Sequence, residues 1–294
     1  MPSRRQIREA VIQFLYCADI EGGAEASSLR DAFWQFVTES DRRALVLATW
    51  KLIQHLSLGR EERYAEMVER LPNARAVLRA RPELESSAAA LDRIFELEEA
   101  WSAQFSALAK IRRDDEDDTV SEKFGAGFDK LFSIDRDLRF ARSEFLRVLD
   151  DHPGLRPQLE PVAGPINRLD RISERLQMIQ HPEDFPDQAE FSKIRESRAS
   201  LTELREKSDR IADAVLAEKP QIDERLNAVV ENFAPERIDP IDRAILRLGT
   251  WEILSNPDVP TPVAINEAIE LAKKFGTTDS GRFVNGILDK IAKS

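Results

Sequence analysis

Near its C-terminus the chain reads VAINEAIELAKKFG over residues 263–276 and DSGRFVNGILDK over residues 279–290. In both segments apolar residues recur every three or four positions, which is the spacing of one buried helix face. Thr261 as a cap, Pro262 as the first helical residue and Gly276 at the end are typical helix boundaries. The segments therefore predict two helices, with apolar stripes formed by Ile265, Ala268, Ile269, Ala272 and Phe275, and by Phe283, Val284, Ile287, Leu288 and Ile291.

The N-terminus predicts another helix, from about Ser3 to Ile20. Beside its apolar stripe, Arg5, Gln13 and Tyr16 fall within an arc of roughly 80°, with Arg8 between Arg5 and the stripe. The helix thus has an arginine-bearing edge next to a buried face formed by Ile7, Ala10, Val11, Phe14, Leu15 and Ala18.

Two further helices are predicted close to these. One spans about Ser28–Thr38, with Trp34 at the margin of its inner face. The other spans residues 237–254, with Asp239 as its N-cap and Pro240 at its first position. The inner face of the first of these helices consists of Leu29, Phe33, Phe36 and Val37.

The middle of the chain, about residues 40–207, has a different pattern. Apolar residues repeat by seven, which favours long helices packed side by side at shallow angles. Breaks are predicted at residues 114–118, 151–165 and 181–186. The clearest heptad series are Ile94, Trp101 and Leu108, and Phe124, Leu131, Leu138 and Phe145.

Composition limits the class of protein. The chain has 294 residues, of which 42% are hydrophobic and 33% charged, which is typical of a soluble globular protein of one large or two ordinary domains. No apolar run approaches the roughly 20 residues of a membrane-spanning helix, and no signal peptide is expected. The single cysteine, Cys17, suits a reducing cytoplasm.

No catalytic or metal motif is visible. The histidines, His55, His152 and His181, are isolated, and there is no glycine-rich phosphate loop. The acidic run at 114–118 lacks the alternating ligands and turn glycine of a calcium loop, so a solvated loop is favoured. We expect no cofactor, no metal and no enzymatic activity.

The helices at the two ends resemble a known family. RRQIREAVIQFLY at 4–16 resembles the opening helix of the bacterial transcription antitermination factor family NusB, and the two C-terminal segments quoted above resemble its last two helices. IDRAILRLGTWEIL at 241–254 fits the helix before these, and residues 208–233 fit the preceding one more weakly. Family members are about half as long as this chain, so the middle segment is a departure.

The resemblance implies an all-α fold: a NusB-like helical bundle formed by residues 1–39 and 208–294, interrupted by a helical insertion at 40–207. It also implies binding of boxA, a short single-stranded element of ribosomal RNA leader transcripts, together with the ribosomal protein NusE. The complex joins RNA polymerase and suppresses premature termination. No membrane partner is expected, and a homodimer is left open because heptads fit internal packing and self-association equally well.

By the same resemblance, Asp242 and Asp279 correspond to residues for partner contact and antitermination strength. The RNA-binding residues are expected to be Arg4, Arg5, Arg8, Gln13, Tyr16, Ser280, Arg282 and Phe283. Arginines pair with phosphates and stack on bases, and a tyrosine offers a flat stacking surface.

Structural interpretations stand beside these roles. Arginines on a helix edge are often only a solvated face, Tyr16 and Phe283 can be core residues, Asp279 can be a helix cap, and Asp242 can be a first-turn acid.

Two rival functions are open. The net charge of −11 and the thin arginine cluster fit a NusB-like scaffold that has lost boxA specificity and acts through its insertion. Some ribosomal RNA cytosine methyltransferases carry a NusB-like domain, but they need a following α/β domain, which is not seen after Lys290.

Overall fold

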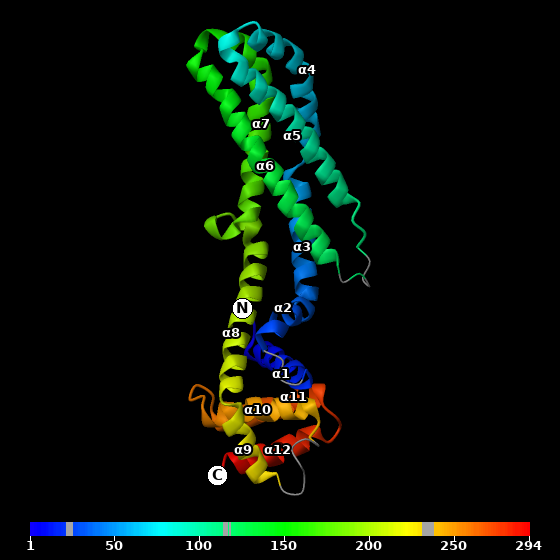
Figure 1. Ribbon diagram of the computed structural model, residues 1–294, viewed down its shortest axis with the longest axis vertical. Helices are drawn as coiled ribbons and strands as arrows, with labels where there is room; N and C mark the ends of the chain where they lie inside the picture. The colour runs from blue at the N-terminus through cyan, green and yellow to red at the C-terminus, as the bar shows by residue number, and fades with distance from the viewer. Residues whose placement is uncertain (22–25, 114–116, 118, 231–237) are drawn as a thin grey trace. The chain divides into compact units, whose positions relative to one another are not determined.

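The computed structural model describes residues 1–21, 26–113, 117, 119–230 and 238–294, without the side chains of 26 and 27 (Figure 1). Within these residues every regular element is a helix, so the predicted all-α fold is confirmed. None of the described helices is long and apolar enough to span a membrane.

Two compact units make up the chain. Unit 1 consists of Met1–Glu39 and Arg198–Ser294, and unit 2 of Ser40–Ser197. The predicted limit at residue 207 lies inside a continuous helix, α8, which spans Ser192–Ala217. The assignment of the predicted segments as separate domains stays a prediction.

Unit 1 is built around one central helix, α10. This helix packs against α1, α9, α11 and α12, and ten of its fifteen residues are buried. The apolar stripe predicted for the N-terminal helix is buried in the same core. Besides the C-terminal part of α8, the helices of unit 1 are α1 (Arg4–Ile20), α2 (Ala26–Val37), α9 (Lys219–Val229), α10 (Pro240–Leu254), α11 (Thr261–Phe275) and α12 (Ser280–Ile291).

The helix starts of unit 1 follow local sequence signals. The Ser3 hydroxyl accepts a hydrogen bond from the Gln6 backbone, and the Gln6 side chain accepts one from the Ser3 backbone, which is a complete capping box. Asp239 caps α10 through the amide of Ile241, as predicted. Helix α11 begins at Thr261 with Pro260 as its N-cap, one residue earlier than predicted.

The predicted inner face of the second helix is partly wrong. Phe36 is 82% exposed, whereas Trp34 is buried and its indole donates a hydrogen bond to Asp209 at 3.0 Å. The Trp34 ring also packs edge-on against Phe33. Trp34 is buried because α8 supplies a polar partner for its N–H, which periodicity within α2 does not reveal.

Unit 2 contains a four-helix bundle in which α4 and α6 each pack against both α5 and α7 (Figure 1). Helix α3 joins the same core, because its fully buried Trp50 contacts Phe105 of α5 and Phe124 of α6. The helices are α3 (Glu39–Leu56), α4 (Arg60–Arg79), α5 (Glu85–Ala109), α6 (Val120–Asp151) and α7 (Arg156–Gln180), with short 3₁₀ segments at Pro82–Leu84, Pro153–Leu155, Pro182–Asp184 and Ala189–Phe191.

Every member of the two heptad series given above is buried, as predicted. The predicted break at 151–165 is too long, because α7 begins at Arg156 and continues through Pro161 and Pro165. The two prolines lack a backbone N–H and so remove two helical hydrogen bonds. Burial of Leu159, Val162 and Ile166 against the bundle offsets this loss of stability.

Two turns of unit 2 were not predicted from the sequence. One lies between α3 and α4, where Gly59 has a φ of 73°, a left-handed conformation that favours glycine. The other precedes the 3₁₀ segment at Pro82–Leu84. Of the acidic run at 114–118, only Asp117 is among the described residues, and the start of the predicted 237–254 helix also lies outside them.

Candidate nucleic-acid interface

The arginine edge of α1 is only partly available to a ligand. Arg4 is exposed, and the structure describes no ion pair for it. Arg5 is half-exposed and donates two hydrogen bonds to Glu267 of α11, from Nε at 3.1 Å and from Nη2 at 2.8 Å. This forked pair raises the pKa of Arg5 and lowers that of Glu267, so both groups are charged at neutral pH.

Arg8 lies inside unit 1 rather than on its surface. Its side chain is 6% exposed, and Nε donates to Oε1 of Glu252, itself 4% exposed, at 2.8 Å. Burial raises the pKa of Glu252, and the nearby charge of Arg8 opposes that rise. Oε2 of Glu267 lies 3.9 Å from Nη1 of Arg8. Arg8 therefore fastens α1 to α10 and α11, and its role in RNA contact stays a prediction.

Gln13 and Tyr16 lie further along α1, and both are half-buried. Tyr16 packs against the core of unit 1. Each side chain keeps an accessible part, so the edge is compatible with stacking and hydrogen bonding to a base.

The predicted residues of α12 differ in accessibility. Arg282 is 91% exposed, and Phe283 is half-buried against the unit 1 core. Ser280 is buried: its hydroxyl donates to Asp242 at 2.8 Å and accepts from the amide of Thr277 at 2.8 Å. Arg282 and Phe283 can reach a ligand directly, whereas Ser280 holds the start of the helix in place.

The two acidic candidates also differ. Asp242 is 7% exposed, and burial raises its pKa although the Ser280 hydrogen bond acts in the opposite direction. It ties α10 to the start of α12. Asp279 is exposed at the N-cap position of α12, where its side chain makes no capping hydrogen bond.

The end of α11 connects the α1 edge to α12, which the sequence reasoning missed. Lys274 donates to Glu9 of α1 at 2.7 Å, and Lys273 donates to Glu270 at 2.8 Å. Lys273 also lines the start of α12, because a Cβ built on Gly281 would lie 3.3 Å from its Cγ. The only sequence signal was a basic last turn, which the helix dipole explains without a ligand. We call Arg4, Arg5, Lys273, Lys274 and Arg282 the basic surface.

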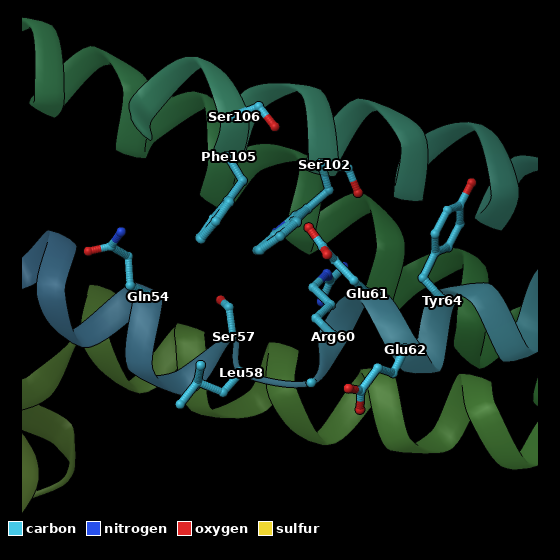
Figure 2. Close-up of a pocket in the computed structure, with 12 residues that line it drawn as sticks. Gln54, Ser57, Leu58, Arg60, Glu61, Glu62, Tyr64, Ser102, Phe105 and Ser106 are labelled. Atoms are coloured by element: carbon cyan, nitrogen blue, oxygen red, sulfur yellow. The ribbon is translucent and has the colours of Figure 1, made fainter. Parts of the chain in front are cut away.

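Unit 2 holds a cavity of about 370 Å³ between the α3–α4 turn and α5 (Figure 2). Figure 2 shows Phe105 pointing into it from α5, with Ser57 and Arg60 opposite. The Arg60 guanidinium lies 3.8 Å from the centre of the Trp101 ring. Exposed Glu61 and Glu62 also line this cavity and oppose an anionic ligand, and no predicted RNA-binding residue lines it.

Behind this cavity a buried polar network joins the four helices of the bundle. Glu98 of α5 accepts from Arg60 of α4 at 2.7 Å and from Arg142 of α6. Arg142 also donates to Ser173 of α7 at 2.7 Å, and Ser173 donates to Asp135 at 2.6 Å. Burial lowers the pKa of Arg60 and raises that of Asp135. Such a network penalises any shift of one helix along another, because a shift would strand a buried charge.

Comparisons with known proteins agree with the resemblance of the C-terminal segments. Residues 162–293 match the model of the NusB family. The transcription antitermination protein NusB of Pseudothermotoga lettingae is 52% identical over 75 residues, 26% of this chain and 54% of that protein. The transcription antitermination protein NusB of Desulfitobacterium hafniense (strain DSM 10664) is 45% identical over 87 residues, which are 30% of this chain and 59% of that protein.

A solved structure of T. maritima NusB is 36% identical in sequence to the matched part of this chain. The match covers 40% of this chain and 83% of the T. maritima chain, with a TM-score of 0.32. The chain spans about half the length of the curated relatives it matches. The family match covers α10, α11 and nearly all of the chain after it, whereas α1 lies outside the matched residues.

Proposed function

Because residues 162–293 of this chain match the NusB family model, we propose that the chain is an RNA-binding transcription antitermination factor. Unit 1 binds boxA-type single-stranded RNA of ribosomal RNA leaders together with the ribosomal protein NusE, and the complex acts on RNA polymerase to suppress premature termination. The observation that carries the proposal is the NusB match over α10 to α12, shared with relatives named transcription antitermination proteins. The proposed role is binding, without a catalytic step.

The basic surface supports RNA binding in an otherwise acidic chain. Its cations lie on α1, at the end of α11 and at the start of α12. The Lys274–Glu9 pair links the first two of these helices, and the Lys273 side chain lies close to Gly281 of α12. Half-buried Tyr16 and Phe283 lie on two of these helices. Stacking on aromatic side chains contributes about 1–3 kcal/mol per base, so two such contacts matter even at a net charge of −11.

Burial separates the proposed residues into two groups. Arg4, Arg5 and Arg282 supply phosphate contacts, with Gln13, Tyr16 and Phe283 at the bases. Arg8 and Ser280 act indirectly, by fixing α1 and α12.

For the NusE contact, exposed Asp279 is available directly. Asp242 acts through its hydrogen bond to Ser280, which sets the start of α12.

Fluorescence anisotropy with the full chain tests the proposal. A labelled boxA RNA from the organism's ribosomal leader is titrated at 50 and 200 mM salt, with and without its NusE, beside an RNA with altered boxA bases. We expect preference for boxA, tighter binding with NusE, and affinity that falls linearly on a log–log salt plot. Equal affinity for both RNAs and no effect of NusE would contradict the proposal.

A second candidate is a NusB-like scaffold that has lost boxA specificity and acts through unit 2. The observation that favours it is the pairing of Arg5, Lys273 and Lys274 with carboxylates, which reduces the positive potential of the basic surface. The same titration separates the two candidates, because a scaffold would show no base preference and no coupling to NusE.

A further inference from the structure

Two carboxylates form ion pairs with cations of the basic surface. Glu267 accepts both hydrogen bonds that Arg5 makes in the structure, and Glu9 accepts from Lys274. Each pair joins α1 to α11, and the two acids are only partly exposed, at 22% for Glu267 and 18% for Glu9. Their partners extend further into solvent, at 50% for Arg5 and 57% for Lys274.

From this geometry we propose that RNA binds unit 1 by ion-pair exchange, in which phosphate groups replace Glu267 at Arg5 and Glu9 at Lys274. Glu267 and Glu9 are then internal competitors that limit affinity for RNA, and Lys274 is an RNA-contacting residue. The inference rests on the proposed RNA-binding function and adds the residues that regulate its strength.

Chemistry makes the exchange feasible at Arg5. A guanidinium fork fits a phosphate as well as a carboxylate, and each gives charge-assisted hydrogen bonds. Ion pairs with a solvent-exposed cation are weak, because water and salt screen them, so a phosphate with its own counterions to release can displace the carboxylate.

The carboxylate that Arg5 leaves is not stranded. Oε2 of Glu267 lies 3.9 Å from Nη1 of Arg8, whose buried side chain stays in place through Glu252. Glu267 therefore keeps a positive neighbour when Arg5 turns to the RNA. Arg8, held beneath the surface, thus contributes to the exchange without touching RNA.

The exchange is independent of base sequence, because it involves phosphates only. Glu267→Gln removes the competing charge while the amide oxygen still accepts one hydrogen bond, so the surface keeps its shape. The same holds for Glu9→Gln. Each change is expected to raise affinity about 1.4- to fivefold, the range measured for exposed ion pairs, and to do so equally for boxA RNA and for RNA with altered bases.

The test compares full-length variants by anisotropy on both RNAs at 50 mM salt. Glu224→Gln is the matched control, because Glu224 is an exposed acid of α9 for which the structure describes no ion pair and its replacement changes net charge equally. Lys274→Gln is expected to weaken binding to both RNAs and to reduce the salt slope by about 1.

Several outcomes overturn the exchange: Glu267→Gln and Glu9→Gln binding no tighter than the unmodified chain, Glu224→Gln tightening as much as they do, or Lys274→Gln leaving affinity and slope unchanged. Circular dichroism of each variant shows that its helices are intact. Failure of the proposed function looks different: the two glutamine variants tighten binding, but neither RNA is preferred. A chain that binds neither RNA at 50 mM salt refutes both ideas.

Discussion

The Arg8–Glu252 pair gives the sharpest prediction for unit 1. Arg8→Ala leaves the Glu252 carboxylate buried without its partner, since the two side chains are only 6% and 4% exposed. Breaking one side of a buried pair costs about 3–5 kcal/mol. At about 1.4 kcal/mol per factor of ten, protection of α10 amides from hydrogen exchange should fall by about two to three and a half orders of magnitude.

Hydrogen–deuterium exchange read by mass spectrometry resolves this loss by segment. Peptides from α1, α10 and α11 should lose protection, while those from α5 and α6 in unit 2 should not. Arg5→Ala is the control, because its pair with Glu267 is exposed on the arginine side. Protection of α10 in Arg8→Ala within about threefold of the unmodified chain would refute the assignment of Arg8 to the core.

Acid should partly rescue the Arg8→Ala variant. Burial already raises the pKa of Glu252, and loss of Arg8 removes the main opposing charge. A carboxyl whose folded pKa lies above its unfolded value binds its proton more tightly in the native state, so stability rises as pH falls through the folded pKa towards 4.5. A variant whose stability deficit is unchanged between pH 7 and pH 5 would contradict this.

Three further substitutions test the packing. Glu98→Gln removes the charge that Arg60 and Arg142 share, and should destabilise unit 2 by about 3–5 kcal/mol in urea unfolding. Asp19→Asn should flatten the fall in unit 1 stability below pH 4. Burial raises the Asp19 pKa, but hydrogen bonds from two arginines lower it by more, so the folded pKa lies below the usual value. The stability that this carboxylate contributes is therefore lost as pH falls through its folded pKa. Gly249→Ala places a Cβ 2.7 Å from a methyl of buried Leu288 and should cost about 1–3 kcal/mol.

Each of these has a result that would count against it. Unchanged urea unfolding in Glu98→Gln would mean that the network is not buried as described. An acid limb that persists in Asp19→Asn would place the responsible carboxyl elsewhere. For Gly249→Ala the control is Gly286→Ala, where nothing lies within 4 Å of the new Cβ and stability should hold or rise by up to about 1 kcal/mol. Equal effects of the two alanines would exclude the steric explanation.

Features set by neighbouring residues were predictable from the sequence. The caps at Ser3 and Asp239 depend on atoms two or three residues away, and the heptad series of α5 and α6 depends only on helical period. These signals give the all-α fold and most of both cores.

Features set by distant partners were not predictable. The helical period places Arg8 closer to the apolar stripe than Arg5 but does not bury its charge; Glu252, 244 positions away, supplies the partner that makes Arg8 a core residue. Trp34 is buried where Asp209 accepts a hydrogen bond from its indole N–H, and Lys274 joins the basic surface because its side chain pairs with Glu9 of α1. Long-range pairing therefore decided which of the candidate site residues lie at the surface.

Crosslinking tests the central claim, that unit 1 carries the RNA site, most directly. A boxA RNA with a photoreactive base is bound to the full chain at 50 mM salt, irradiated and mapped by mass spectrometry. We predict crosslinks in α1 around Tyr16 and in α12 around Phe283, reduced by Arg5→Ala. Crosslinks confined to α3–α7, or unaffected by that substitution, would contradict the account and place RNA recognition in unit 2.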